Sequence, residues 1–428
     1  MGSVVRSYLA RQKVGCFTIN ECNQKKMPHP PSFDKIVTKA APHVAYFTPR
    51  QPAPAGAFRG AKAPKLFTPL RIRNLNLVNR IGVSPMCLYS AGHDGAPTDY
   101  HLIHYGQYAL RGPSLVIMES VAVSAAGRIT PHCLGIYSDV QKAQLKRIVD
   151  FYHSQGKAIG PQLSHAGMRS SCLPLFYDEC DYPVDDSRGG WLEEVVGPSI
   201  SKEFPHSRAL SAREVALIVS AFKDAVRAAI VDCGFDFVEI HAAHGFLIHQ
   251  FMSPLGNKRT DQYGGSFDNR VRLLTEILDA ACAVRKETGR DFAIFVRISA
   301  SDNDESNERT WRLADSVKLA PLLAARGVDL IDVSSGGMQA AREPHISQRD
   351  MAHSVKSAVK DSCLVSAVGG IRDGKTAEDL LQNGYCDFCL AARGFLKEPG
   401  MVERWADELG ADVQMNLQDG WCFGKVWE

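Results

Sequence analysis

Two histidines, His241 and His244, follow a run of apolar residues that has the composition of a buried strand, Phe235 to Ile240. Imidazoles are uncommon within such a strand because they are polar. A pair at its carboxyl end therefore indicates a site for an anionic or electron-rich group. The rings could donate N–H groups to an oxygen atom, bind zinc with a third ligand, or be satisfied internally as core residues. We favour a donor pair and no metal, because the zinc motif HExxH is absent and the nearest cysteine, Cys233, precedes the strand.

Polar side chains of two other types interrupt apolar runs at Gln162 and Arg297. A carboxamide offers both a donor and an acceptor, which suits the edge of a planar heterocycle. Arg297 lies inside the run Phe295–Ile298, where burying a guanidinium is costly unless an anion accompanies it. An anionic ring nitrogen of a flavin would be such a partner. An internal salt bridge is the alternative.

Glycines follow two of the later apolar runs, and an arginine follows a third: Gly336 and Gly337, Gly369 and Gly370, and Arg393. Backbone N–H groups can approach a ligand closely where no Cβ intervenes, and an arginine adds a fork of donors. Loops of this kind at the last strands of a barrel are typical of a phosphate site. The alternative is that these glycines only form turns.

Eight short apolar runs alternate with amphipathic stretches after Leu66. The predicted strands are Ile81–Ser84, Leu115–Val123, Ala158–Leu163, Phe235–His241, Ala293–Ile298, Leu330–Ser334, Leu364–Val368 and Phe388–Ala392. The predicted helices are Leu102–Leu110, Gln141–His153, Ala212–Asp232, Arg270–Arg285, Trp311–Arg326, Met351–Val359, Ala377–Gln382 and Met401–Leu409. Because buried parallel strands are continuously apolar, this order predicts an α/β fold, a (β/α)8 TIM barrel. A doubly wound sheet would require a GxGxxG after an early strand, and none is present.

The barrel is predicted to occupy residues 66–410. Residues 1–65 are rich in Pro, Lys and Ala and predict an irregular N-terminal extension. The first twenty residues are basic and lack acids, as in a transit peptide, although we favour an unstructured segment. Residues 411–428 form a C-terminal tail, whose Trp421, Phe423 and Trp427 are expected to shape substrate choice together with the insertion Met168–Leu210.

Composition excludes several classes of function. The chain has 428 residues and a formal net charge of +2, so no basic field points to nucleic acid. No apolar run reaches the roughly 18 residues that span a bilayer, so no membrane segment is expected. The twelve cysteines include one CxxC, Cys386 and Cys389, without a second pair. Free thiols are typical of a reducing compartment, which predicts a cytoplasmic protein.

Several motifs in one order resemble the Old Yellow Enzyme ene-reductases, in particular their thermophilic-like, cysteine-containing class. The matching segments are SPMCLYS (Ser84–Ser90), GPQLSHAG (Gly160–Gly167), EIHAAHGFLIHQFMSP (Glu239–Pro254), KRTDQYGGSFDNR (Lys258–Arg270), FVRISASD (Phe295–Asp302), LIDVSSGG (Leu330–Gly337) and VGGI (Val368–Ile371). The resemblance covers Leu66 to about Leu409. It implies noncovalent FMN, reduction by NADPH or NADH, and hydride transfer to an activated alkene.

The same resemblance implies roles for individual residues. The cofactor would be contacted by Ser84, Pro85, Met86, Cys87, Ser120, Gln162, Arg297, Ser335, Gly336, Gly369, Gly370, Ala392 and Arg393. His241 and His244 would bind the carbonyl or nitro oxygen of the substrate and stabilise the developing enolate. Cys87 would modulate the flavin potential, and Tyr89 would contact the substrate. Relatives often form dimers, so a homodimer is a further expectation.

Three positions depart from the pattern of the family. Phe246 replaces the tyrosine that donates a proton, and a phenyl ring has no proton to give. Water or Tyr89 could protonate instead, or the protein could be an isomerase or a desaturase. Ala392 replaces a glycine before the phosphate arginine, and its methyl group could crowd the phosphate. The pair Met168-Arg169 replaces a more basic pair.

The leading prediction is therefore an FMN-dependent oxidoreductase that reduces the activated C=C bond of an α,β-unsaturated carbonyl compound with NAD(P)H. A biosynthetic isomerase or desaturase on the same scaffold is the alternative. Two other classes stay open: a flavin-free barrel lyase or isomerase that uses His241 and His244 as acid and base, and a flavin-binding protein without turnover.

Overall fold

The computed structural model describes residues 39–178, 182–338 and 346–423. The chain divides into two units, residues 1–40 and residues 41–428. Only two residues of the first unit are described, Lys39 and Ala40. Within the described residues no helix is both long and apolar enough to cross a membrane.

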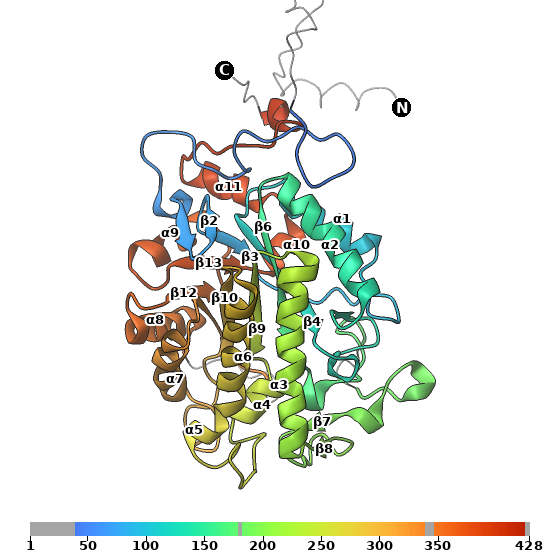
Figure 1. Ribbon diagram of the computed structural model, residues 1–428. Coiled ribbons are helices and arrows are strands. Elements are labelled where there is room, and N and C mark those ends of the chain that lie inside the picture. Colours follow the sequence, from blue (N-terminus) through green and yellow to red (C-terminus); the bar gives the residue numbers. More distant parts are fainter. Residues whose placement is uncertain (1–38, 179–181, 339–345, 424–428) are drawn as a thin grey trace, which may run out of the picture. The chain divides into compact units, whose positions relative to one another are not determined.

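Eight parallel strands close into a barrel (Figure 1). They are β3 (Ile81–Val83), β4 (Leu115–Ala122), β6 (Ala158–Ser164), β9 (Phe237–Ala242), β10 (Ala293–Ser299), β11 (Leu330–Ser334), β12 (Leu364–Val368) and β13 (Phe388–Ala391). Each strand pairs with the next in chain order, and β3 closes the ring by pairing with both β13 and β4. The predicted TIM barrel is confirmed, and each predicted strand lies within two residues of the observed one.

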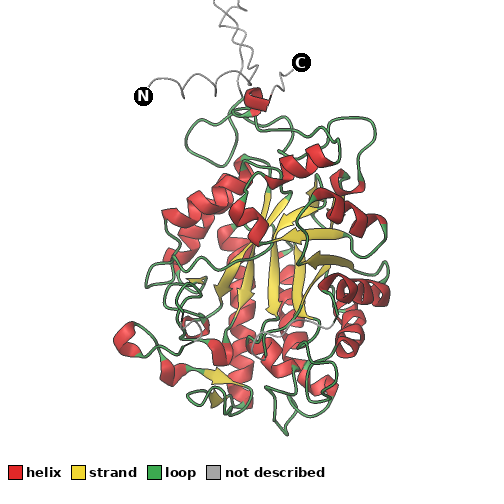
Figure 2. Ribbon diagram, turned by 180° about the vertical axis from the view of Figure 1, so that it is seen from behind, coloured by secondary structure: helices red, strands yellow, loops and turns green. Residues whose placement is uncertain are grey.

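Helices surround the strands (Figure 2). The longer ones are α1 (Asp99–Ala109), α2 (Asp139–Ser154), α3 (Ala212–Arg227), α6 (Arg272–Thr288), α7 (Leu313–Ala325), α8 (Gln348–Val359), α9 (Gly374–Gln382) and α11 (Met401–Glu408). The short ones are α4 (Leu247–Met252), α5 (Phe267–Arg270) and α10 (Arg393–Lys397). A capping box opens α3, where the Ser211 hydroxyl accepts from the N–H of Glu214. A π-helical turn, Ala228–Cys233, ends that helix before β9.

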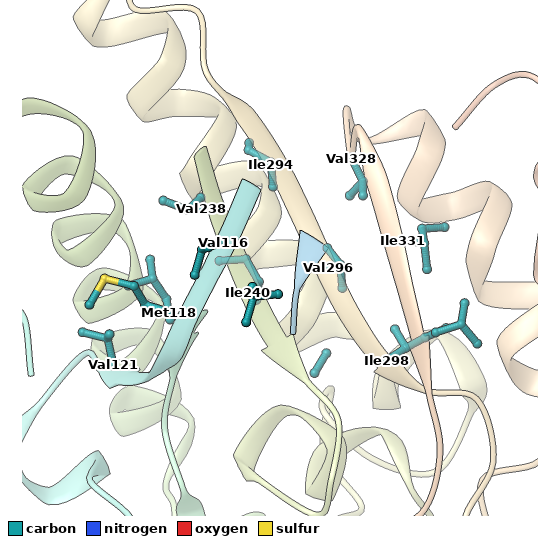
Figure 3. Close-up of a cluster of buried hydrophobic side chains, with 14 of the residues drawn as sticks. Val116, Met118, Val121, Val238, Ile240, Ile294, Val296, Ile298, Val328 and Ile331 are labelled. Atoms are coloured by element: carbon teal, nitrogen blue, oxygen red, sulfur yellow. The ribbon is translucent and has the colours of Figure 1, made fainter. Parts of the chain in front are cut away.

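The two faces of each strand bury different residues. Outward-facing residues pack beneath the helices, as Figure 3 shows for Val238 and Ile240 of β9 and for Val296 of β10. Inward-facing residues at the amino ends form a second apolar cluster, in which the rings of Phe237 and Phe295 stack with centroids 4.6 Å apart. Burying each such side chain contributes about 1.5–3 kcal/mol. The strands are therefore apolar on both faces over their first half, as expected for a buried parallel sheet.

A hairpin closes the amino end of the barrel. It consists of β1 (Leu70–Ile72) and β2 (Leu75–Leu77), which pair antiparallel. Its buried side chains belong to the same apolar cluster as Phe237 and Phe295. The sequence analysis did not predict this hairpin, because three-residue strands leave too little periodicity to detect.

The insertion between β6 and α3 carries the short strands β7 (Val196–Gly197) and β8 (Arg208–Ala209), and another, β5 (Leu134–Gly135), lies beside β4. Trp191 anchors the insertion: its Nε1 donates to the carbonyl of Ala126 at 3.1 Å, and the Arg128 guanidinium lies 4.6 Å from its ring centroid.

The tail packs at the amino end of the barrel. Gly56 N–H donates to the carbonyl of Gln414, and Asn79, just before β3, donates to the carbonyl of Gly56. Trp421 and Phe423 lie beyond this contact and are exposed. Their expected role in substrate choice is therefore wrong within one subunit, because a site at the carboxyl ends of the strands lies at the other end of the barrel. Trp427 lies outside the described residues.

Candidate active site

The inward faces of the strands change from apolar to polar toward their carboxyl ends. On β9, Phe237 is followed by Glu239 and His241 at the next inward positions. A buried polar layer results, formed by Ser84, Gln162, Glu239, Arg297, Asp332 and Ser366. These side chains form two groups: Gln162 is hydrogen-bonded to Glu239. Arg297 is hydrogen-bonded to Ser84 and ion-paired to Asp332, which also accepts from Ser366.

Arg297 has an anionic partner within the protein. Its Nε lies 3.2 Å from Oδ2 of Asp332, and its Nη1 donates to the Ser84 hydroxyl at 2.9 Å. Asp332 also accepts from Ser366 at 2.9 Å. The internal salt bridge, which the sequence left as the alternative, is therefore present. The cost of burying Arg297 does not by itself require an anionic cofactor, although its position at the mouth suits one.

The two histidines point toward each other. Nε2 of His241 and Nδ1 of His244 lie 3.4 Å apart. Burial lowers the pKa of each ring well below its ordinary value, and Arg297 lowers it further, so both rings are neutral. Ala243 N–H donates to Nδ1 of His241 at 3.3 Å, which leaves the proton of that ring on Nε2.

Ser334 decides the tautomer of His244. Its hydroxyl lies 2.8 Å from Nε2 of His244. When Ser334 donates, His244 carries its proton on Nδ1, and two N–H groups then converge on the space between the rings. That arrangement matches a single oxygen atom that accepts from both. Across the described residues, no group of three or more His, Cys, Asp or Glu side chains is placed to hold a metal ion.

The loop that carries His244 is fixed by a second set of contacts. His244 has a φ of 59°, which is unusual outside glycine. Its N–H donates to Ser299 at 2.9 Å, and the next N–H, of Gly245, donates to Nδ1 of His249 at 3.0 Å. His249 is in turn 3.2 Å from the buried carboxylate of Asp302. These bonds hold the unfavourable backbone and keep the His244 ring aimed at His241.

Phe246 lies beside the histidine pair. Its ring meets His241 edge-on, with centroids 5.0 Å apart and planes at 90°. Cys87, which was expected near the flavin, and Tyr89, which was expected near the substrate, pack against the same small apolar cluster as Phe246. Tyr89 has a φ of 51° and contacts the exposed ring of Phe176 from the insertion, with centroids 6.0 Å apart.

The loop after β3, which carries Cys87 and Tyr89, is held by Glu119. Oε2 of this carboxyl accepts from the N–H of Leu88 at 2.9 Å, and Oε1 accepts from Tyr105 of α1 at 3.2 Å. Burial raises the pKa of Glu119 to about 8. A hydrogen bond with Cys133, followed by burial, raises the pKa of Cys87 well above its ordinary value, so Cys87 is a neutral thiol.

A cavity of about 610 Å³ extends from Arg297 at one end to Arg393 at the other. Its wall includes Gly369 and Gly370, both with positive φ. Gly369 has a φ of 95°, a backbone conformation that strains any other residue, so glycine is favoured there. Further cations, Arg372, Lys397 and Arg404, line the same end as Arg393. Ala392 also lines this cavity, and its backbone, with φ −111° and ψ −91°, is neither helical nor extended before α10.

The remaining expected cofactor residues lie in loops and strands outside the lining of this cavity. Pro85 and Met86 belong to the half-buried loop after β3. Ser120 is hydrogen-bonded to Ser164, and Ser335 accepts from Gln348 at 3.4 Å. Gly336, with a φ of 78°, follows β11. Arg169, at one of the departing positions, donates to the carbonyl of Gly337 at 2.8 Å.

The residues suit a flat, anionic cofactor. The cavity joins a donor-and-acceptor layer at one end to a cradle of glycines and cations at the other, and its volume falls within the range of small-molecule sites, roughly 300–1,000 Å³. Oε2 of Glu239 is buried without a hydrogen-bond partner among the described residues. A ring with polar edges and a phosphate tail, as in FMN, fits both ends.

Glu239, Asp332, Ser334 and Glu119 are site residues to which the sequence analysis gave no role. Each is a polar residue within an otherwise apolar run of the sequence. Alternate residues of a strand face the same side, so Glu239 faces the barrel interior together with Phe237 and His241. This two-residue period could have identified Glu239 from the sequence.

Comparison with known proteins identifies the family of the chain. Residues 65–412 match the NADH:flavin oxidoreductase / NADH oxidase family. The chain is 43% identical over 407 residues to an NADH:flavin oxidoreductase of Gibberella zeae, which covers 91% of this chain and 96% of that protein. It is 37% identical to the NADPH dehydrogenase of Bacillus subtilis over 84% of this chain and the whole of that one.

Solved structures give the same result. Morphinone reductase in complex with tetrahydroNAD superposes with a TM-score of 0.65 at 28% identity, over 82% of this chain and 93% of that one. An Old Yellow Enzyme homologue of Zymomonas mobilis gives a TM-score of 0.66 at 26% identity, over 84% and 96%. The chain belongs to the NADH:flavin oxidoreductase / NADH oxidase family, that of the Old Yellow Enzymes, and is an FMN-dependent oxidoreductase that uses NADH or NADPH.

Proposed function

We propose that the protein reduces the activated C=C bond of an α,β-unsaturated carbonyl compound. The observation that carries this proposal is the pair of neutral imidazoles whose Nε2 and Nδ1 atoms lie 3.4 Å apart at the mouth of the barrel. Two donors aimed at one oxygen would draw electron density from the alkene and stabilise the enolate that forms as hydride arrives. Bound FMN would supply the hydride-transfer chemistry between the nicotinamide and the substrate.

The chain's own groups divide the remaining tasks. Gln162 and Arg297 suit the polar edge of the ring, and Gly369, Gly370 and Arg393 suit the phosphate. Tyr89 and the insertion ring Phe176 suit the apolar part of the substrate. Since both histidines are neutral, they polarise the carbonyl by donating hydrogen bonds and do not transfer a proton to it.

Reduction of the alkene also requires a proton at the α-carbon. Phe246 has no ionisable group, so the proton comes from Tyr89 or from water in this proposal. Its replacement of a tyrosine also favours a second candidate, in which the enolate is rearranged or the alkene is formed rather than reduced. Products tell the two apart: an isomerase converts substrate without net consumption of nicotinamide, and a desaturase consumes an oxidant.

The test begins with the purified protein. We expect it to be yellow, to release FMN on denaturation and to lose its flavin absorbance when mixed anaerobically with NADPH or NADH. A panel of enones should then restore the absorbance, with one saturated product formed per nicotinamide oxidised. A reduced flavin that no enone reoxidises would refute the proposed substrate class while leaving the oxidoreductase assignment intact.

A further inference from the structure

Glu239 is a buried carboxyl group for which the reaction above has no use. It faces inward on β9 between Phe237 and His241 and is fully buried. Its Oε1 accepts from Nε2 of Gln162 at 2.8 Å. Its Oε2 has no hydrogen-bond partner among the described residues. A carboxylate in such a place is costly, so its charge and its free oxygen both need an explanation.

The charges that face Glu239 come from the neighbouring strands. Arg297 lies on β10, Asp332 on β11, and the neutral His241 on its own strand. Because Arg297 and Asp332 already form an ion pair, an ionised Glu239 gives the layer a net negative charge. The stacked rings of Phe237 and Phe295 lie below Glu239 in the barrel and offer no solvation to a charge. The layer is electrically neutral only when Glu239 holds a proton.

We propose that Glu239 is a positioning residue for the flavin ring: it holds the Gln162 carboxamide against the ring edge and takes up a proton when the ring is reduced. The inference rests on FMN binding at this site. A reduced ring beside Arg297 carries negative charge, and a second negative charge at Glu239 is then disfavoured. Hydride from the nicotinamide would supply both electrons, and where Glu239 is ionised before reduction, one proton from water would bind Oε2. Reoxidation releases that proton.

The titration of Glu239 gives the pH at which this coupling becomes visible. Burial, followed by the charge of Asp332, raises its pKa to about 8, while Arg297 and the Gln162 hydrogen bond oppose the rise. Below that pH the group is protonated in both redox states and the ring potential is unaffected. Above it, reduction requires an additional proton. The reduction equilibrium should therefore fall by an additional tenfold per pH unit, which is about 30 mV for a two-electron couple.

The experiment compares the midpoint potential of bound FMN in the wild-type holoenzyme and in Glu239→Gln, between pH about 6 and about 9.5. Dithionite with redox mediators supplies the electrons, so neither nicotinamide nor enone enters the measurement. Glu239→Gln keeps an acceptor for Gln162 but does not titrate. We expect the wild-type potential to steepen above pH about 8 and the variant to lack the extra slope. Glu403→Gln, which removes another buried carboxyl of raised pKa, should behave as wild type.

A second measurement needs no variant. In redox-difference infrared spectra at pH about 9, a protonated carboxyl band should appear on reduction of the wild type and shift with ¹³C-glutamate. Parallel potentials across the pH range, or no such band, overturn the role of Glu239. In that case normal enone turnover would leave the proposed function standing. Unchanged slopes in Glu239→Gln with a turnover defect would also refute proton uptake. If the wild-type protein did not bind FMN, both the role of Glu239 and the proposed function would be refuted.

Discussion

Replacing Phe246 by tyrosine restores the proton donor that this chain lacks. The ring packs edge-on against His241 with a centroid distance of 5.0 Å, and it is only partly buried. A positioned general acid typically contributes 10²–10⁴-fold to the step that it assists. We expect the lower end, about 10²-fold, because Tyr89 or water already supplies protons in the wild type.

Two half-reactions isolate the effect. In anaerobic stopped-flow experiments, the reduction of bound FMN by NADPH should be the same in wild type and Phe246→Tyr, because no α-carbon is protonated there. Reoxidation by an enone should be about 10²-fold faster in the variant, with a changed solvent deuterium isotope effect. Phe267→Tyr, which adds the same hydroxyl to a ring stacked on Trp311, is the matched control and should change neither half-reaction.

The outcome that refutes this reasoning is specific. If Phe246→Tyr reoxidises with an unchanged rate and isotope effect, protonation is not limited by the missing hydroxyl, and Phe246 is a packing residue only. If the rate is unchanged but the product shifts from an isomer to the saturated compound, the wild type is the isomerase described as the second candidate.

Other changes have equally definite outcomes. Alanine at His241 or His244 should lower kcat/KM for an enone by about 10²–10³-fold, and an unaltered value would exclude the paired-donor role. Arg393→Ala should weaken FMN binding by about 10–10²-fold, measured by the fluorescence of released flavin, and undiminished affinity would move the phosphate elsewhere. The pKa of Glu119 is raised to about 8 when folded but is near 4.3 when unfolded, so the folded state retains a proton and stability falls as pH rises across this window. Glu119→Gln should flatten that fall in urea titrations, and curves parallel to the wild type would contradict it.

Much of the barrel could be read from the sequence because its outward strand faces are uninterrupted. Val238 and Ile240, or Val296 and Ile298, pack under helices and supply half of each apolar run. Strand ends were harder to place, since apolar character persists into the flanking turns. The hairpin β1–β2 was missed because three residues cannot display a period.

The site was readable where one residue is anomalous in itself. His241 and Arg297 are unexpected in buried strands, and His244 follows the end of one of them. Their partners were not readable, because they depend on how strands are aligned. Asp332 meets Arg297 only through the register of β10 with β11, and Ser334 meets His244 across ninety residues of chain. Short-range patterns do not contain such pairings.

The clamp formed by Glu119 joins the outer shell of the barrel to its interior. Tyr105 belongs to α1, and through Glu119 it fixes the backbone of Leu88, next to Cys87. A laboratory selection for altered enone preference should therefore recover substitutions on that helix as well as in the pocket. These substitutions would act by shifting the turn that carries Cys87, without contacting a bound molecule themselves.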